Sequence, residues 1–261
     1  MVGAGREAPP AFRVDAIGDR VHFVQTEHVN WVLHVGPGGV TLLDSGYAGQ
    51  VDVLEASLQA VGCRADDVTA VLITHAHADH LGGAAWLADT YGTPVYAPVD
   101  ELANLHREVV EQAGPAEVIR NSWRPGVGRW AAGMLPLLRG GARLGVPSAT
   151  ALPMRDGRVD VPGRPLLRLI AGHTSGHATY EFEEAGVLVA GDALVTRHRT
   201  SPIEGPQLLP SIFQHDLARA TASLGELRGS NARVVLPGHG EPWAGPVDAA
   251  VTIALAHGAA W

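Results

Sequence analysis

The chain has 261 residues, 46% of them hydrophobic, and a formal net charge of −8. That length and composition suffice for one globular domain over residues 1–261, and the negative charge argues against a nucleic-acid-binding surface. A lone cysteine, Cys63, excludes an intrachain disulfide framework, and no apolar run approaches the roughly 18 residues of a membrane span.

The first part of the chain predicts a tail followed by antiparallel strands. Residues 1–12 are expected to be flexible, and they lack the hydrophobic segment of a secretory signal, so we expect a cytoplasmic protein with no membrane partner. Short apolar runs between turns predict strands over residues 14–17, 21–24, 30–35 and 40–43. Asp44 follows the last of these runs. It is expected either to form a turn or to orient the ligands of a nearby site.

The next segment holds the densest group of metal-ligand side chains in the sequence. Apolar spacing predicts a helix over residues 51–61 and a strand over 68–73, and directly after that strand come His75, His77, Asp79 and His80. A zinc ion needs about four nitrogen, sulfur or oxygen ligands at roughly 2 Å, so a tight loop that turns these side chains toward one point forms a metal site. Asp79 also stands near the start of a predicted helix over residues 81–91, where its alternative role is helix capping.

Three later strand ends carry ligand-type side chains in similar contexts. His173 and His177 follow the apolar run 166–171, Asp192 follows 187–190, and His239 follows 234–236. Each of these turns contains glycine, which permits a positive φ and a close backbone approach. Strand ends that converge on one edge of a sheet bring such side chains together, so we expect one site built from four loops.

Taken together, these motifs resemble the metallo-β-lactamase-fold hydrolases, the superfamily that includes glyoxalase II and many lactonases. The resemblance covers about residues 14–243. It implies an α/β (α+β) fold, a four-layer αββα sandwich of two mixed sheets with helices on both outer faces. It also implies that His75, His77 and His177 hold one metal ion, that Asp79, His80 and His239 hold a second, and that Asp192 bridges the two. His173 is assigned a supporting or structural role.

The resemblance further implies a reaction. Two Zn²⁺ ions per chain, with iron or manganese as alternatives, activate a water molecule that attacks an ester, thioester or lactone carbonyl. Asp79 is the predicted catalytic residue, and the expected partner is a small-molecule substrate with an acyl or anionic group. Two alternatives stay open. One is a mononuclear iron oxygenase resembling the persulfide dioxygenases, with His75, His177 and Asp192 as ligands, and the other is a non-catalytic binding module.

The remaining segments predict the surroundings of the site. Residues 94–97 predict a strand and 99–113 a helix, and the glycine- and proline-rich stretch that follows predicts an inserted lid over about 99–165. Loops at the edge of a site commonly carry function, although a surface insertion without substrate contact is the alternative. The segment 197–199, Arg-His-Arg, is expected either to bind an anionic substrate group or to be a solvated loop. Amphipathic spacing predicts C-terminal helices over 216–228 and 247–257.

Overall fold

The computed structural model describes residues 12–138 and 145–261, and these form two seven-stranded sheets. In the first sheet the strands follow chain order: β1 (Phe12–Ile17), β2 (Val21–Thr26), β3 (Asn30–Gly36), β4 (Gly39–Leu43), β5 (Val68–Leu72), β6 (Val95–Ala97) and β7 (Thr150–Ala151). Strands β1 to β4 pair in antiparallel fashion, and β4 to β7 pair in parallel. The predicted antiparallel start of the chain is therefore confirmed.

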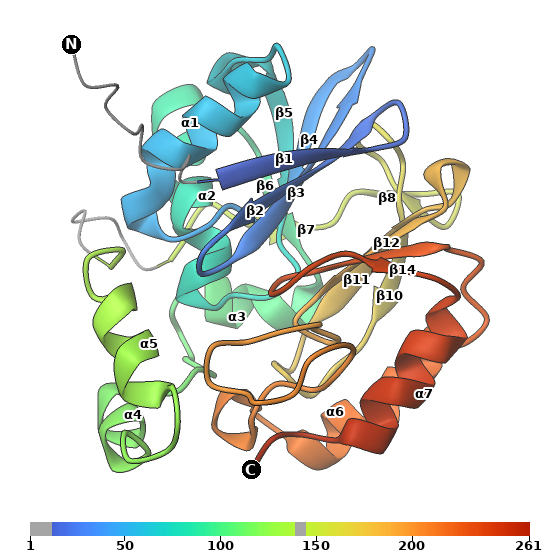
Figure 1. The fold of residues 1–261 in the computed structure, drawn as a ribbon. Coiled ribbons are helices and arrows are strands. Elements are labelled where there is room, and N and C mark those ends of the chain that lie inside the picture. The colour runs from blue at the N-terminus through green and yellow to red at the C-terminus, as the bar shows by residue number, and fades with distance from the viewer. Residues whose placement is uncertain (1–11, 139–144) are drawn as a thin grey trace, which may run out of the picture.

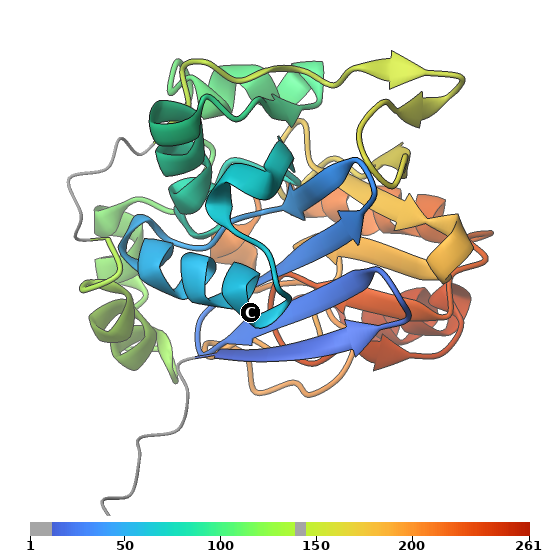
Figure 2. The ribbon, with the colours of Figure 1, turned by 90° about the horizontal axis from the view of Figure 1, so that it is seen from above.

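The second sheet is also mixed, in the order β14-β13-β12-β11-β10-β9-β8. Its strands are β8 (Met154–Arg155), β9 (Arg158–Val159), β10 (Leu166–Leu169), β11 (Ala178–Phe182), β12 (Val187–Gly191), β13 (Val234–Pro237) and β14 (Trp243–Ala244). Among these described strands, only β12 and β13 pair in parallel. Figure 2 shows the two sheets lying face to face.

Alternation along the strands builds three apolar layers from these two sheets. Val32, Leu43 and Leu72 point between the sheets, where they pack with Tyr180 and Val189 of the second sheet. The residues next to them in the chain point the other way, to the outer faces. Both faces of the central strands are thus buried. This explains why the sequences of these strands are continuously apolar and do not alternate between apolar and polar residues.

Helices cover the two outer faces (Figure 1). On the first sheet lie α1 (Val51–Ala60) and α2 (Ala78–Tyr91), whose leucines pack on Trp31 and Val71. On the second sheet lie α6 (Leu217–Ser223) and α7 (Val247–His257), which pack on Leu188 and Val235. The arrangement is the predicted four-layer αββα sandwich. No helix among the described residues is both long and apolar enough to cross a bilayer.

The middle of the chain differs from its prediction. The predicted helix over 99–113 is confined to a 3₁₀ turn at Val99–Glu101 and α3 (Leu102–Leu105), because Arg107 has a φ of +61° and the backbone turns away to place Glu111 beside the site. Helices α4 (Pro115–Arg120) and α5 (Val127–Met134) follow.

The predicted lid range and tail also need adjustment. The last part of the range 99–165 supplies edge strands to both sheets, β7 to the first and β8 and β9 to the second, and not a cover for the site. Residues 1–11 of the predicted tail and residues 139–144 of the predicted lid lie outside the described part of the chain. Phe12, assigned to the tail, begins β1.

One buried hydroxyl joins the two sheets directly behind the histidine-rich loop. The Tyr180 hydroxyl donates to the Ile73 carbonyl at 2.9 Å, and the tyrosine is fully buried. Tyr180→Phe removes this bond and leaves the polar carbonyl in an apolar layer, so we expect a loss of about 1–2 kcal/mol in the free energy of unfolding. Urea denaturation measures it, with Tyr91→Phe at an exposed tyrosine as the control. Equal stability of the two variants would contradict this role for Tyr180.

Candidate metal centre

Four loops at one edge of the sandwich bring the ligand-type side chains together. The loop between β5 and α2 carries His75 and His77, and the first turn of α2 carries Asp79 and His80. The β10–β11 loop carries His173, and Asp192 and His239 follow the ends of β12 and β13. Helix α2 begins after His77, so Asp79 lies inside the first turn and does not cap the helix.

Three overlapping groups result, each with its donor atoms within 4.8 Å of one another. The groups are His75, His77 and His173; His75, His80 and Asp192; and Asp79, His80 and His239. Because the middle group shares members with both others, the three form one continuous cluster. Six of the seven sequence-predicted ligands belong to it.

The Asp192 carboxylate lies at the centre of this cluster. Its Oδ2 atom is 3.2 Å from His239 Nε2, 3.5 Å from His173 Nε2, 3.6 Å from His80 Nε2 and 3.8 Å from His75 Nε2. Burial alone would raise the pKa of the Asp192 carboxyl, but the facing His239 and His80 hold that pKa well below its ordinary value. The Asp192 carboxylate thus lies between imidazoles of the first group, His75 and His173, and of the last group, His80 and His239.

The assignment of His177 to the cluster is corrected by the structure, which places His173 there instead. His173 Nε2 lies 3.1 Å from both His75 Nε2 and His77 Nδ1. His177 Nε2 instead accepts the backbone N–H of Asp192 at 3.1 Å, so its lone pair is already used. His177 therefore contacts the backbone of Asp192, and the structure places His173 rather than His177 within the cluster.

Unpartnered atoms at the centre show that these residues fit a cation. His80 Nε2 and Asp192 Oδ1 are buried and have no hydrogen-bond partner in the described structure. Burial lowers the pKa of His75 and His173 well below the ordinary value, which keeps both imidazoles neutral, as metal ligation requires. Convergent neutral nitrogens beside an ionised carboxylate suit zinc, and also iron or manganese.

In His80, His239 and His77, the ring nitrogen that faces away from the cluster has a second partner, which fixes the orientation of the ring. His80 Nδ1 lies 2.8 Å from Asp44 Oδ2, and His239 Nδ1 lies 2.7 Å from the His28 carbonyl oxygen. His77 is turned the other way, because its Nε2 lies 2.8 Å from the Glu111 carbonyl oxygen and its Nδ1 faces the cluster. Such partners set the tautomer and raise the basicity of a ligating imidazole.

Asp44 does more than hold one ring. Its Oδ1 accepts the Thr74 backbone N–H and its Oδ2 accepts the Thr74 hydroxyl, both at 2.8 Å, and that hydroxyl lies 3.0 Å from His75 Nδ1. One carboxylate thus orients His80 directly and His75 through Thr74. Asp44 has a φ of +59°, a backbone conformation that aspartate adopts more readily than most residues. Of the two roles expected for Asp44, the structure favours orientation of the ligands.

Two glutamates that the sequence did not single out join the histidine loops. Glu101 is fully buried and accepts hydrogen bonds from the Ala76 backbone at 2.7 Å and the Thr174 hydroxyl at 2.8 Å. Burial raises the pKa of its carboxyl to about 7, against the effect of these donors. Glu111 accepts both the backbone N–H and the hydroxyl of Ser175, at 2.7 and 2.6 Å. Nothing in the local sequence around either glutamate signals this role, because their partners are distant in the chain.

Glycine is required beside the central carboxylate. A Cβ atom at Gly238 would lie 2.1 Å from Asp192 Oδ1 and 2.8 Å from a carbon of the His80 ring. Any larger residue would therefore push Asp192 away from its present position. The glycine that precedes His239 thus lets two strand ends approach closely.

An apolar cavity of about 640 Å³ opens onto the cluster. Its floor includes His77, Asp79 and Asp192, and its walls come from α4, α5 and the segment around Phe213. Tyr47, which is buried, lines the same cavity, and its hydroxyl lies 3.9 Å from the sulfur of Met134. The segment from about 112 to 138, within the range expected to form a lid, therefore flanks the cluster.

The arginines of segment 197–199 line a different cavity, of about 720 Å³. It shares Trp130, His198 and His239 with the apolar cavity. Arg199 is paired with Glu27, and Arg197 lies 3.6 Å from Glu204. Each of these two arginines therefore has an acidic partner on the surface of the protein.

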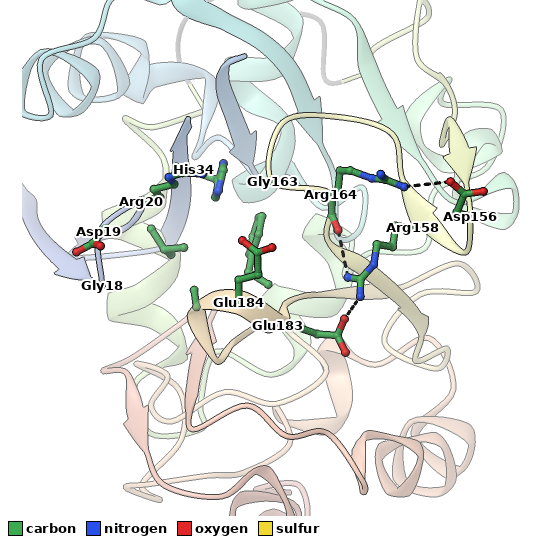
Figure 3. A pocket seen from close by; sticks show the side chains of 13 residues that line it. Gly18, Asp19, Arg20, His34, Asp156, Arg158, Gly163, Arg164, Glu183 and Glu184 are labelled. Atoms are coloured by element: carbon green, nitrogen blue, oxygen red, sulfur yellow. Dashed lines mark hydrogen bonds and ion pairs between the residues drawn. The ribbon is translucent and has the colours of Figure 1, made fainter. Parts of the chain in front are cut away.

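A further polar cavity, of about 820 Å³, lies at the opposite ends of the strands (Figure 3). Four of its charged side chains form two pairs: Arg158 pairs with Glu183, and Arg164 lies 3.6 Å from Asp156. None of the described residues of the histidine cluster lines this cavity. The candidate functional site is therefore the histidine cluster together with the apolar cavity.

The geometry around Asp44 generates a prediction. Asp44→Asn replaces one acceptor oxygen with an N–H₂ group, so His80 and Thr74 can no longer both be held. We expect metal affinity to fall about 10- to 100-fold with the fold intact. Competition with a chromophoric chelator measures the affinity, and Asp52→Asn on the exposed surface of α1 is the control. Unchanged affinity in Asp44→Asn would refute the proposed support.

Comparison with known proteins agrees with this geometry. The model of the metallo-beta-lactamase superfamily matches residues 24–239. Among curated proteins, the probable metallo-hydrolase YflN of Bacillus subtilis is 27% identical over 218 residues, which cover 80% of this chain and 78% of that protein. A hydroxyacylglutathione hydrolase of Alkalilimnicola ehrlichii is 45% identical, but over only 53 residues, 20% of each chain.

Solved structures give the same result for the fold. A metallo-beta-lactamase family protein from Thermus thermophilus superposes with a TM-score of 0.61 at 27% identity, covering 95% of this chain and 79% of that one. The metallo-beta-lactamase SMB-1, solved with mercaptoacetic acid, gives a TM-score of 0.58 at 20% identity, covering 87% and 79% of the two chains. At that identity SMB-1 supports the fold alone. With the family model matched over most of its length, the chain belongs to the metallo-β-lactamase superfamily.

Proposed function

We propose that the chain is a hydrolase that binds two divalent metal ions, zinc in the first place, and cleaves a carboxylic ester, thioester or lactone. The observation that carries this proposal is the position of Asp192, whose Oδ2 lies within 3.2–3.8 Å of four imidazoles. His75, His77 and His173 would hold one ion, and Asp79, His80 and His239 the other. Asp192 would contact both.

Such a metal pair supplies a nucleophile from water at neutral pH and polarises the carbonyl oxygen that is attacked. In the reaction one water adds across the carbonyl carbon and the bond to the leaving oxygen or sulfur breaks, which yields a carboxylic acid and an alcohol or thiol. No serine or cysteine nucleophile is needed for this balance. The relatives named as metallo-hydrolase and hydroxyacylglutathione hydrolase support a hydrolytic reaction.

The chain's own residues orient the reaction. Asp79 is 17% exposed at its side chain and lines the cavity, so its carboxylate reaches the side from which substrate arrives. Its Oδ2 lies 3.5 Å from His239 Nε2. Asp79 is therefore placed to orient the attacking water and to accept its proton.

A first prediction concerns the central carboxylate. Asp192→Asn removes the negative charge shared by four imidazoles, so we expect kcat/KM for ester or thioester hydrolysis to fall by more than the about 10- to 100-fold typical of residues that only support ligands. A panel of chromogenic esters, thioesters and lactones provides the assay for the zinc-loaded protein. Asp160→Asn, at an exposed position, is the matched control. Full activity in Asp192→Asn would rule out the proposed mechanism.

A second prediction separates the two histidines of the β10–β11 loop. His173→Ala removes a nitrogen 3.1 Å from both His75 and His77, so we expect the loss of about one tightly bound metal ion per chain. His177→Ala removes only an acceptor for a backbone N–H, so metal content is expected to persist with reduced stability. Mass spectrometry of the metals in both purified variants provides the measurement. The reverse outcome, metal loss in His177→Ala alone, would reinstate the assignment expected from the sequence.

A further inference from the structure

The cavity beside the cluster is apolar over almost its whole wall. The apolar side chains that line it include Val118, Ile119, Trp130, Met134, Leu135 and Phe213. A volume of about 640 Å³ falls in the range of about 300–1,000 Å³ typical of small-molecule sites. Its two carboxylates, Asp79 and Asp192, belong to the histidine cluster at the floor. The cavity thus has a reactive end and an apolar body.

The mouth of the cavity is apolar as well. Ile119 is 71% exposed, Leu135 58% and Leu138 38%, yet all three line the cavity. Large apolar side chains exposed together usually mark a binding surface. Their continuity with the cavity indicates an apolar occupant that extends from the interior to the mouth.

The charges around the cavity also indicate an uncharged occupant. No arginine or lysine is found among the described residues that line it, whereas Asp79 and Asp192 place two carboxylates at its floor. An anionic group in the body of the cavity would therefore find no cationic side chain to balance it. The arginines near the cluster, Arg129, Arg197 and Arg199, line the other cavity, beyond Trp130 and His198.

We propose that the acyl half of the substrate is an extended, uncharged apolar group that occupies this cavity, with the scissile carbonyl at the floor beside Asp79 and Asp192. The inference rests on the proposed hydrolase function and specifies its substrate class. Trp130 and Met134 of α5 and Val118 of α4 act as the specificity-determining residues, because they form the wall that an acyl chain touches.

A homologous series of thioesters tests the proposal, with one leaving thiol and straight acyl chains from acetyl to decanoyl. Burial of each methylene contributes about 0.8 kcal/mol, so kcat/KM of the zinc-loaded protein is expected to rise up to about fourfold per added methylene until the cavity is filled. Hydrolysis that is fastest with acetyl and falls with every added carbon would overturn the proposal.

A matched pair of variants locates the effect. Ala131 lines the cavity on α5, whereas Ala116 on α4 is exposed and does not line it. Ala131→Trp fills the cavity, so we expect kcat/KM for decanoyl to fall more than tenfold while that for acetyl stays within about twofold. Ala116→Trp is expected to leave both unchanged. Equal losses for the two acyl chains in Ala131→Trp would contradict the assignment of the cavity.

Binding separates this inference from the function on which it rests. Calorimetry with decanoate and acetate on the zinc-loaded protein is expected to show decanoate binding at least tenfold tighter, with the difference abolished by Ala131→Trp. That result without any hydrolysis would reject the proposed function and retain the apolar ligand class. Hydrolysis without a preference for decanoate would retain the proposed function and reject the apolar ligand class. Dimerisation that buries Leu135, seen by sedimentation and abolished by Leu135→Glu, would assign the mouth to a second copy and overturn the proposal.

Discussion

The structure of this site depends on one buried negative charge. Asp192 is almost completely buried among imidazoles, and a carboxylate in such surroundings persists only if cations or hydrogen bonds compensate it. One of its oxygens, Oδ1, has no hydrogen-bond partner in the described structure, and His80 Nε2 beside it has none either. Metal ions between these atoms would satisfy both, and the same ions would turn a costly cluster of buried polar groups into a stable one.

The fold supplies the rigidity that this cluster needs. The loops after β5, β12 and β13 begin at strands whose two faces are buried, and each of these strands packs against a helix layer on one side and the opposite sheet on the other. Tyr180 joins the sheets at Ile73, and Glu101 joins the two histidine loops behind the cluster. Buried strands anchor these loops, and the hydrogen bonds of Tyr180 and Glu101 support them from the protein interior. The ring nitrogens can therefore keep their positions with little reorganisation, as metal ligation and catalysis require.

Much of this could be predicted from the sequence because the signals are local. The motif from His75 to His80, the strand-end glycines and the positions of Asp192 and His239 led to the correct fold and to six members of the cluster. The resemblance assigned His177 rather than His173 to the site, because both histidines follow glycine in one turn and only the backbone path of that turn decides which ring enters the cluster. Strand β11 (Ala178–Phe182) was missed, since its start coincides with the end of that turn. Glu101 and Glu111 act through partners distant in the chain, and no local pattern marks them.

The cavity extends the account from chemistry to substrate. Members of one superfamily can share a metal-binding framework and differ in reaction, because function lies in the site and its walls rather than in the fold. Here the walls come from α4 and α5, in a segment whose sequence shows little regular spacing. That segment gives the site an apolar body, and the cluster gives it a polar floor.

The most direct test of the central claim is the metal content of the full chain purified without added metal, determined by mass spectrometry against amino-acid analysis. A pair of ions around Asp192 requires close to two divalent ions per chain, and a hydrolytic site favours zinc. A single iron per chain would contradict the account and redirect the chemistry toward oxygen.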